Sequence, residues 1–498
     1  QGQVTLAVAR RALANGDLVQ SLERKAYDWG VQHSSREPLA RVAVIAIDDA
    51  SIANLGRWPW PRDLHARMTD LLAGAKAKVI VNTSLFFEPQ VDAGYAYVTK
   101  LNALHAQVVL EPGVEVPQLA EMGDLLKEAE LKLNTDRILA ESVERSGTVV
   151  LPMLFSLGDP KGRPDKPLPE YVAKNRLPQV NESSGDAWPT SSVLMPIEAL
   201  GSRASAIGHL NANADVDGGI RAEPLVLRYY DQFFPSLSLM IAAKSLNLGP
   251  ADIKARLGEE VRLGNLRIAT DGLTQMNTFF YKDRGEKPAF QVDSFYDVLS
   301  GKIPATKYQD KIVLIGATAA GVGASQVTPV SPAMSPVLTL AHSVSSILQE
   351  HFFVTPSWSG YASFGAFLLV AIYLIALLPR LSAGMGALAT ALLLAMLVGT
   401  HFGLMVGAGM WIQLMAAASL LVVGHLLLTT KRFLMTERGK EKSEAESAES
   451  NRMLGLAFQG QGQLDMAFDK FRKCPLDDGL MEILYNLALD YERKRVID

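Results

Sequence analysis

The stretch VIAIDDASIANLGRWPWPRDLHARM, residues 44–68, carries the strongest signal for the fold. It opens in an apolar run rich in β-branched residues, which is typical of a strand buried on both faces of a sheet. The run ends on two adjacent carboxylates, and a segment of alternating tryptophans and prolines leads into an amphipathic helix expected over 62–77. A second apolar strand is expected at 78–87. The stretch therefore predicts a βαβ unit with two parallel strands and a right-handed crossover.

Strands and helices continue to alternate as far as residue 353. Further buried strands are expected at 147–155 and 311–318, and a helix over 339–353 is expected to feed directly into a membrane span. This alternation predicts one α/β domain of about 300 residues with a central mixed sheet.

The stretch 96–146 is expected to be mostly helical. Within it, five apolar residues recur three and four positions apart: Leu119, Met122, Leu126, Ala129 and Leu133. Such spacing is typical of a coiled-coil seam. Two interpretations are open: the helix packs on its own sheet, or the helical segment 117–143 is an arm that pairs with another subunit.

The composition narrows the class of protein. The chain has 498 residues, too many for one ordinary core, so two or more domains are expected. Its net charge of −4 argues against a nucleic-acid binder that relies on bulk positive charge, and we expect no nucleic-acid partner. Cys474 is the single cysteine, so no intramolecular disulfide can form.

Three apolar segments follow the α/β domain, at 361–378, 386–405 and 409–428. Each is long enough to cross a bilayer, and none carries the charged face of a soluble surface helix. Lys431 and Arg432 follow the third segment, so the positive-inside rule places residues 1–356 outside the cytoplasm and the tail inside. Three crossings behind an outside domain require an earlier one, and we expect a fourth helix that precedes residue 1 or includes its first residues. The predicted location is the bacterial cytoplasmic (inner) membrane.

Polar and aromatic side chains gather at the carboxyl ends of the first two predicted strands, where open α/β sheets bind ligands. The candidate ligand-binding residues are Asp48, Asp49, Trp58, Trp60, Arg62, His65 and Glu88. A small polar ligand fits this set, as does a divalent cation held by oxygens, so the identity of any metal stays open.

Packing is the favoured explanation of the same residues. Asp49 or Ser51 can cap the short helix after the strand, Asp48 can pair with Arg62, and the two tryptophans can seal the edge of the sheet. The prolines that flank them restrict the backbone of this loop in either case.

No pattern points to a catalytic residue or to a cofactor. The loop GATAAGVGAS, residues 316–325, lacks the Lys-Ser/Thr ending of a phosphate-binding P-loop, so a flexible loop is the favoured interpretation. An extracytoplasmic hydrolase is a remote third alternative.

The C-terminal tail has the pattern of a tetratricopeptide repeat. Gly455, Phe458, Ala467 and Phe471 have that repeat's spacing, and Ala488 and Tyr491 repeat the first two after 33 residues. Because one and a half repeats cannot bury a core alone, we expect more chain or a cytoplasmic protein partner to complete it.

Several segments together resemble the second class of CHASE domains, the extracellular sensors of bacterial cyclases and kinases. They are IDDASIANLGRWPWPRDLHARM, GHLNANADVDGGIRAEPLVLRYYDQFFPSLSLMIA, KIVLIGATAAGVG and LAHSVSSILQEHFF, in that order within residues 20–355. The resemblance implies a sensor that signals across the membrane to a cytoplasmic output. One position departs from it: Thr83 stands where this family commonly carries an aspartate, which implies a weakened site if that carboxylate holds a ligand.

Sensors of this family with a tetratricopeptide segment resemble bacterial transmembrane serine/threonine kinases. No Gly-rich loop, HRD or DFG motif occurs in these 498 residues, so we expect any kinase domain to lie outside this chain.

We therefore predict a membrane receptor that acts as a homo-oligomer, in which the helix over 339–353 carries a ligand-driven shift rigidly into the first span. The expected parts are an N-terminal membrane-proximal helix (1–35), a sensor domain (36–356), three transmembrane helices (357–430), a charged linker (431–450) and a tetratricopeptide-like hairpin (451–498). The alternative is a structural homo-oligomeric membrane assembly, a ring or filament without ligand-driven signalling.

Overall fold

A computed structural model describes residues 2–90, 93–108, 116–164, 166–182 and 184–497. The chain divides into two compact units. The first contains residues 1–364 together with 398–416, and the second contains residues 365–397 together with 417–498.

The first unit is built on a nine-stranded mixed sheet. Six of its strands are parallel, in the spatial order β14 (Gln291–Ser294), β1 (Val42–Ile47), β15 (Ile312–Ala317), β2 (Val79–Asn82), β3 (Val149–Leu157) and β6 (Ala206–His209). The sheet continues from the second half of β3 into three further strands, β5 (Trp188–Leu194), β8 (Val226–Tyr229) and β9 (Gln232–Pro235). The predicted α/β class with a central mixed sheet is confirmed.

The order of the strands differs from the expected βαβ unit, in which the first two strands form a parallel pair. β1 and β2 are parallel, but β15 lies between them, with Val42 opposite Ile312 on one side and Val79 opposite Ile312 on the other. A strand from late in the chain is therefore inserted between the first two strands. The carboxyl end of β15, and the loop that follows it, lies between the two predicted halves of the site.

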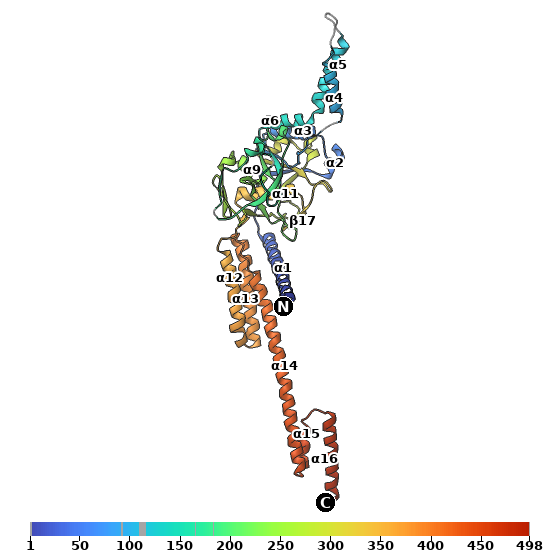
Figure 1. Cartoon of the computed structure of the whole chain (residues 1–498), viewed down its shortest axis with the longest axis vertical. Helices are drawn as coiled ribbons and strands as arrows, with labels where there is room; N and C mark the ends of the chain where they lie inside the picture. Colours follow the sequence, from blue (N-terminus) through green and yellow to red (C-terminus); the bar gives the residue numbers. More distant parts are fainter. Residues whose placement is uncertain (1, 91–92, 109–115, 165, 183, 498) are drawn as a thin grey trace. The chain divides into compact units, whose positions relative to one another are not determined.

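Helices cover both faces of the sheet (Figure 1). Ala43, Ile45 and Ile47 of β1 belong to the core beneath α3 (Arg62–Gly74) and α6 (Thr135–Ser146). Val42 and Val44 belong to the opposite core, beneath α9 (Leu237–Ser245) and α11 (Pro336–Gln349). Because neighbouring side chains of a strand point to opposite faces, a strand buried on both sides has to be apolar throughout, as β1 is.

Smaller elements complete this unit. A four-stranded sheet has the order β12 (Leu266–Ala269), β11 (Glu260–Leu263), β10 (Ile253–Arg256) and β4 (Gln179–Asn181), and a three-stranded sheet has the order β18 (Phe352–Phe353), β13 (Gln275–Thr278) and β7 (Ala222–Pro224). The hairpin strands are β16 (Gln326–Thr328) and β17 (Ser331–Met334), and the short helices are α2 (Asp49–Leu55), α7 (Glu170–Ala173), α8 (Glu198–Gly201) and α10 (Phe295–Leu299).

The helix expected over 339–353 is shorter than predicted. α11 ends at Gln349, Glu350 takes a left-handed conformation with φ 53°, and β18 then pairs with β13. No continuous helix therefore runs from the described part of α11 into the first membrane span, and the predicted rigid transmission through it is wrong.

The segment with the predicted seam forms a two-helix arm. α4 (Ala93–His105) packs against α5 (Pro117–Leu133), where the His105 ring lies 2.7 Å from the Leu119 carbonyl oxygen and against Gly123. α5 thus packs on another helix, whereas α6, which follows, packs on the sheet core. Met122 and Leu125 remain exposed on the arm.

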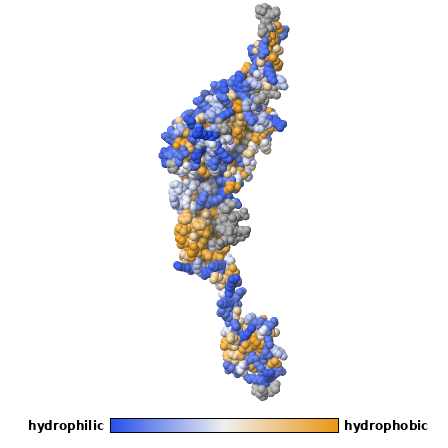
Figure 2. Space-filling view, in the orientation of Figure 1, coloured by the Kyte–Doolittle hydropathy of each residue, from blue (hydrophilic) through white to orange (hydrophobic). Residues whose placement is uncertain are grey.

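Among the residues that the structure describes, three helices are long and apolar enough to cross a membrane: Ser359–Arg380, Ala383–Ala408 and Met415–Gly460. The first comprises α12 (Ser359–Ile372), a π-helical turn (Tyr373–Leu377) and a 3-10 turn (Leu378–Arg380). The second comprises α13 (Ala383–Gly403) and a π-helical turn (Leu404–Ala408), and the third is α14 (Met415–Gly460). Hydrophobic surface gathers over α12 and α13 (Figure 2). The third span begins at Met415 and not at residue 409, because Gly409 is left-handed and Met410 pairs with Val354.

The tail is a helical hairpin. The end of α14 packs with α15 (Leu464–Phe471) and α16 (Asp478–Ile497) around Ala467, Phe471 and Leu487. A β-carbon added to Gly455 would lie 2.4 Å from the Phe471 ring, so this glycine allows the two helices to approach closely.

Candidate functional site

A cavity of about 730 Å³ opens at the carboxyl ends of β2 and β15. Five of the seven predicted site residues line it: Trp58, Trp60, Arg62, His65 and Glu88. The chain segment after β2 also lines the cavity and includes the exposed Leu85. Leu194 of β5 is a further lining residue, and 53% of its surface is exposed. Most of the predicted site residues therefore line one cavity.

Asp48 and Asp49 do not line this cavity. Asp48 is the N-cap of α2, where its carboxylate accepts hydrogen bonds from the Ser51 amide at 2.8 Å and from the Ser294 hydroxyl at 2.9 Å. Burial alone would raise the pKa of Asp48, but these hydrogen bonds favour the charged carboxylate and bring its pKa below the usual value. Asp49 is exposed in the first turn of the same helix. The predicted capping residues, Asp49 and Ser51, are therefore wrong: Asp48 caps α2, and Ser51 donates a hydrogen bond to it.

Trp60 and His65 form the buried side of the cavity. Trp60 is 2% exposed, and its indole donates a hydrogen bond to the Gly56 carbonyl at 2.8 Å. His65 lies 3.0 Å from the Asn82 side chain, and its ring contacts the rings of Trp58 and Phe86. Burial, assisted by the nearby Arg62 charge, lowers the pKa of His65 to about 4. His65 is therefore a neutral, fixed ring at neutral pH.

Arg62 is anchored away from Asp48. Its guanidinium pairs with Asp136 at the start of α6 and donates to the Glu88 carbonyl, and it lies 5.2 Å from the centre of the Phe86 ring. The predicted Asp48–Arg62 pair is therefore wrong. Arg62 instead joins α3, α6 and the chain segment after β2, and α3 and that segment both line the cavity.

The floor of the cavity depends on a close approach at Gly316. A β-carbon at this position would lie 2.6 Å from the Thr83 hydroxyl and 2.6 Å from the Val337 side chain. Thr83 donates a hydrogen bond to the Ile315 carbonyl at 3.0 Å and also lines the cavity. Thr83, the position that departs from the resemblance in sequence, thus lies in the cavity wall.

A second cavity of about 470 Å³ shares Ala317, Gly323 and Pro336 with the first. Its walls include Tyr281, the buried His342 and residues of β17. The loop after β15, residues 317–325, therefore borders both cavities. The sequence of this loop predicts flexibility and no chemical role, because glycine and alanine side chains carry no functional group.

Neither cavity has the donors of a metal site. Within the described residues, no group of three or more histidine, cysteine, aspartate or glutamate side chains is placed to hold a metal ion. The arrangement suits an uncharged or amphipathic small molecule that stacks on indole rings and meets few fixed charges.

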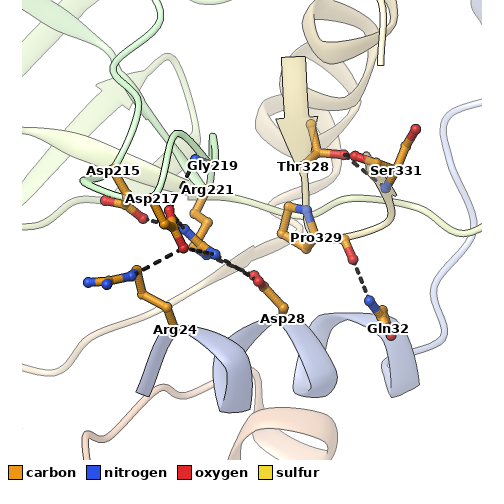
Figure 3. A network of polar contacts seen from close by, with 10 residues as sticks. All are labelled: Arg24, Asp28, Gln32, Asp215, Asp217, Gly219, Arg221, Thr328, Pro329 and Ser331. Carbon is orange, nitrogen blue, oxygen red and sulfur yellow. Dashed lines mark hydrogen bonds and ion pairs between the residues drawn. The ribbon is translucent and has the colours of Figure 1, made fainter. Parts of the chain in front are cut away.

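A polar network ties this domain to α1 (Gly2–His33). Arg221 binds Asp28 of α1 through two hydrogen bonds, of 2.8 and 2.7 Å, and also binds Asp215 and Asp217 (Figure 3). Arg24, one turn from Asp28, lies 3.2 Å from Asp217. The hydrogen bonds from Arg221 lower the pKa of Asp217 to about 2.

The same face of α1 reaches the hairpin that borders the second cavity. Gln32 donates a hydrogen bond of 2.6 Å to the Pro329 carbonyl, between β16 and β17 (Figure 3). The Ile220 amide, next to Arg221, donates to Val327 of β16 at 2.8 Å. None of these contacts was predicted. The spacing of Arg24, Asp28 and Gln32 is the signal in the sequence, since residues four apart share one helical face.

α1 also contacts the turn before α14. The Glu23 carboxylate accepts hydrogen bonds from the Trp411 indole and from the Met415 amide, each at 3.0 Å, and Tyr27 packs on Trp411. Residues 398–416 belong to the same compact unit as residues 1–364, which include the mixed sheet. This contact was not predicted, because Glu23 and Trp411 lie 388 residues apart in the sequence.

One comparison with known proteins found a match. The family model of the CHASE2 domain matches residues 4–378. Neither a curated protein nor a solved structure matches the chain.

Proposed function

The chain belongs to the CHASE2 domain family, and we propose that it is a membrane receptor. Its sensory domain would bind a small molecule in the cavity bordered by Trp58, Trp60 and His65. The observation that carries the proposal is a preformed cavity of about 730 Å³ whose border loop is shared with a second cavity. Aromatic walls with few fixed charges are typical of sites for small organic ligands.

The proposed signal route leaves the domain through α1. The loop 317–325 borders both cavities, β17 lines the second one, and the β16–β17 hairpin binds Gln32 of α1. α1 in turn holds the Met415 amide through Glu23, and Met415 is the first residue of the 46-residue α14. A ligand would act by favouring one of two packings of the hairpin against α1, to the extent that it binds that packing more tightly.

The proposed orientation places the sensory domain outside the cytoplasm and the tail inside. Cysteine labelling tests it in a Cys474→Ser background, with Ser325→Cys in the cavity loop and Ser443→Cys in α14, both at exposed positions. A membrane-impermeant maleimide should label residue 325 in intact spheroplasts and residue 443 only after permeabilisation. The reverse pattern would reject the orientation.

We propose that the receptor signals to a serine/threonine kinase that lies outside this chain. The tail hairpin, which we propose to be of the tetratricopeptide type, would connect the receptor to this kinase or bind it. The buried contact between Gly455 and Phe471 supports such a hairpin. The reading frame beyond Asp498 tests this: a Gly-rich loop followed by HRD and DFG motifs would support the kinase, and a different catalytic domain would replace it.

A cavity-filling substitution tests the sensing role without knowledge of the ligand. Leu194→Trp places a large side chain at the cavity, and Leu246→Trp changes another partly exposed leucine, which does not line it. Hydrogen exchange in the full chain should change at the Ile220 and Met415 amides for Leu194→Trp alone. Unchanged exchange at both amides would reject the proposed route.

A structural assembly is the second candidate function. The arm formed by α4 and α5 favours it, because Tyr97, Leu101 and Leu104 of α4 are all at least half exposed and lie on one face. Mass measurement in detergent separates the two candidates: a large closed complex without ligand supports assembly, and a dimer whose form depends on ligand supports the receptor.

A further inference from the structure

A third cavity, of about 460 Å³, lies in the second unit and has no part in the proposed sensing route. It is bordered by the end of the first span at Leu378, by the beginning of α13, and by residues 425–436 of α14. All of these residues belong to the same compact unit.

The lining of this cavity has two chemical parts. Leu378, Leu428 and Met435 give it an apolar wall, and Lys431 and Arg432 give it two cationic groups. Thr429 and Thr436 also line the cavity; their hydroxyl groups donate to the His425 and Arg432 carbonyls, and their oxygens can still accept a hydrogen bond. An apolar wall beside paired cations and hydroxyls matches a molecule that has both an acyl chain and an anionic headgroup.

The two cations are not neutralised by the protein. Among the residues that the structure describes, no acidic side chain lines the cavity, and neither Lys431 nor Arg432 forms an ion pair. The Arg432 guanidinium donates one hydrogen bond of 2.8 Å to the Leu381 carbonyl, which fixes its position beside the start of α13. Its other N–H groups and the Lys431 ammonium stay available for an anion.

The position along the helix also suits a lipid headgroup. Lys431 and Arg432 follow directly on the apolar part of α14, and the segment after them is charged. Cations at this level meet lipid phosphates, since the membrane interface begins where the apolar run ends. The first turn of α13 adds the partial positive charge of a helix N-terminus to the same cavity.

We propose that this cavity binds one anionic phospholipid, with its phosphate on Lys431 and Arg432 and an acyl chain along the Leu378, Leu428 and Met435 wall. A glycerol-phosphate headgroup without an amine fits best, because a choline or ethanolamine group would bring a third positive charge to the two cations. The proposal stands independently of the sensing role.

Native mass spectrometry of the full chain in detergent tests the proposal, with phosphatidylglycerol and phosphatidylcholine of the same acyl chains as probes. The wild type should retain phosphatidylglycerol in preference to phosphatidylcholine. The double variant Lys431→Gln/Arg432→Gln should bind phosphatidylglycerol roughly 10- to 30-fold more weakly, since each cation near the interface contributes about 1 kcal/mol.

The matched control is Lys440→Gln/Lys442→Gln, which removes the same charge from the same helix at positions that do not line the cavity. It should retain phosphatidylglycerol like the wild type. Thr436→Trp keeps both cations but fills the cavity, so it should also lose the lipid, and it serves as the second test if the charge variant does not fold.

Three outcomes would overturn the proposal. The first is equal binding of the two lipids by the wild type, and the second is full phosphatidylglycerol binding by both cavity variants. The third is displacement of phosphatidylglycerol by millimolar inorganic phosphate, which would identify a soluble anion as the ligand.

Discussion

Arg221 and Asp28 form a two-point ion pair, with Nε to Oδ1 at 2.8 Å and Nη2 to Oδ2 at 2.7 Å, between the core of the sensory domain and α1. The Arg221 side chain is only 10% exposed, and it also binds Asp215 and Asp217. Two parallel hydrogen bonds fix orientation as well as distance. This pair therefore defines how α1 is placed against the domain.

Replacement of Asp28 with alanine should destabilise this contact. Hydrogen bonds to charged groups contribute about 1.5–3 kcal/mol, so the free energy of unfolding of Asp28→Ala should fall by an amount in this range. Urea unfolding of the full chain in detergent measures it. The control is Glu144→Ala, which breaks the exposed Arg203–Glu144 pair and should cost about 0–1 kcal/mol. Equal effects of the two variants would contradict a special role for Asp28.

The two tryptophans of the cavity should respond differently to substitution. Trp60 is 2% exposed and belongs to the sheet core, so Trp60→Ala should lower the free energy of unfolding by about 3–5 kcal/mol. Trp58 is half-buried at the cavity, so Trp58→Ala should leave most of the stability intact and alter binding or output. Thermal unfolding of both variants checks the difference, and comparable losses would show that Trp58 is a core residue.

Acidification should destabilise the sensory domain through its buried histidines. Burial lowers the pKa of His209 to about 3 and that of His342 to about 3, against about 6.5 in the unfolded chain. Between pH 6.5 and about 3 the unfolded state therefore binds more protons than the folded state, and the free energy of unfolding falls as the pH falls. Each histidine contributes at most about 1.4 kcal/mol per pH unit.

His209 gives the sharpest test of this pH dependence. Among the described residues, neither of its ring nitrogens has a hydrogen-bond partner, so His209→Leu removes a titrating group without breaking a hydrogen bond. The pH dependence of urea unfolding between pH 6.5 and 4 should be shallower in the variant. An unchanged slope would show that His209 does not stay neutral in the folded state.

Removal of the Glu23 carboxylate should release the beginning of α14. The Met415 amide donates its hydrogen bond to Glu23, so Glu23→Ala should increase hydrogen exchange at Met415. Trp411→Phe removes only the other hydrogen bond of Glu23 and keeps an aromatic ring beside Tyr27, so it should have a smaller effect at Met415. If exchange at Met415 is the same in Glu23→Ala and the wild type, α1 does not restrain α14.

Local patterns made much of the architecture predictable from the sequence. The apolar, β-branched runs at 42–47 and 312–317 predict strands buried on both faces, and three apolar runs within the described residues are long enough to be candidate membrane spans. The grouping of five predicted residues at one cavity has the same origin. Trp58, Trp60, Arg62 and His65 follow one strand within eighteen residues, so their proximity is largely a local property of the chain.

The sequence by itself therefore determined which elements form and which side chains follow the first strand. Only the tertiary structure decided that β15 separates β1 from β2, that Arg62 pairs with Asp136, and that Asp28 meets Arg221. Each of these is a pairing between residues distant in the sequence, where several strands or carboxylates are equally suitable partners. The choice among them depends on the packing of the whole domain, because backbone hydrogen bonds and charges have the same local chemistry wherever they occur along the chain.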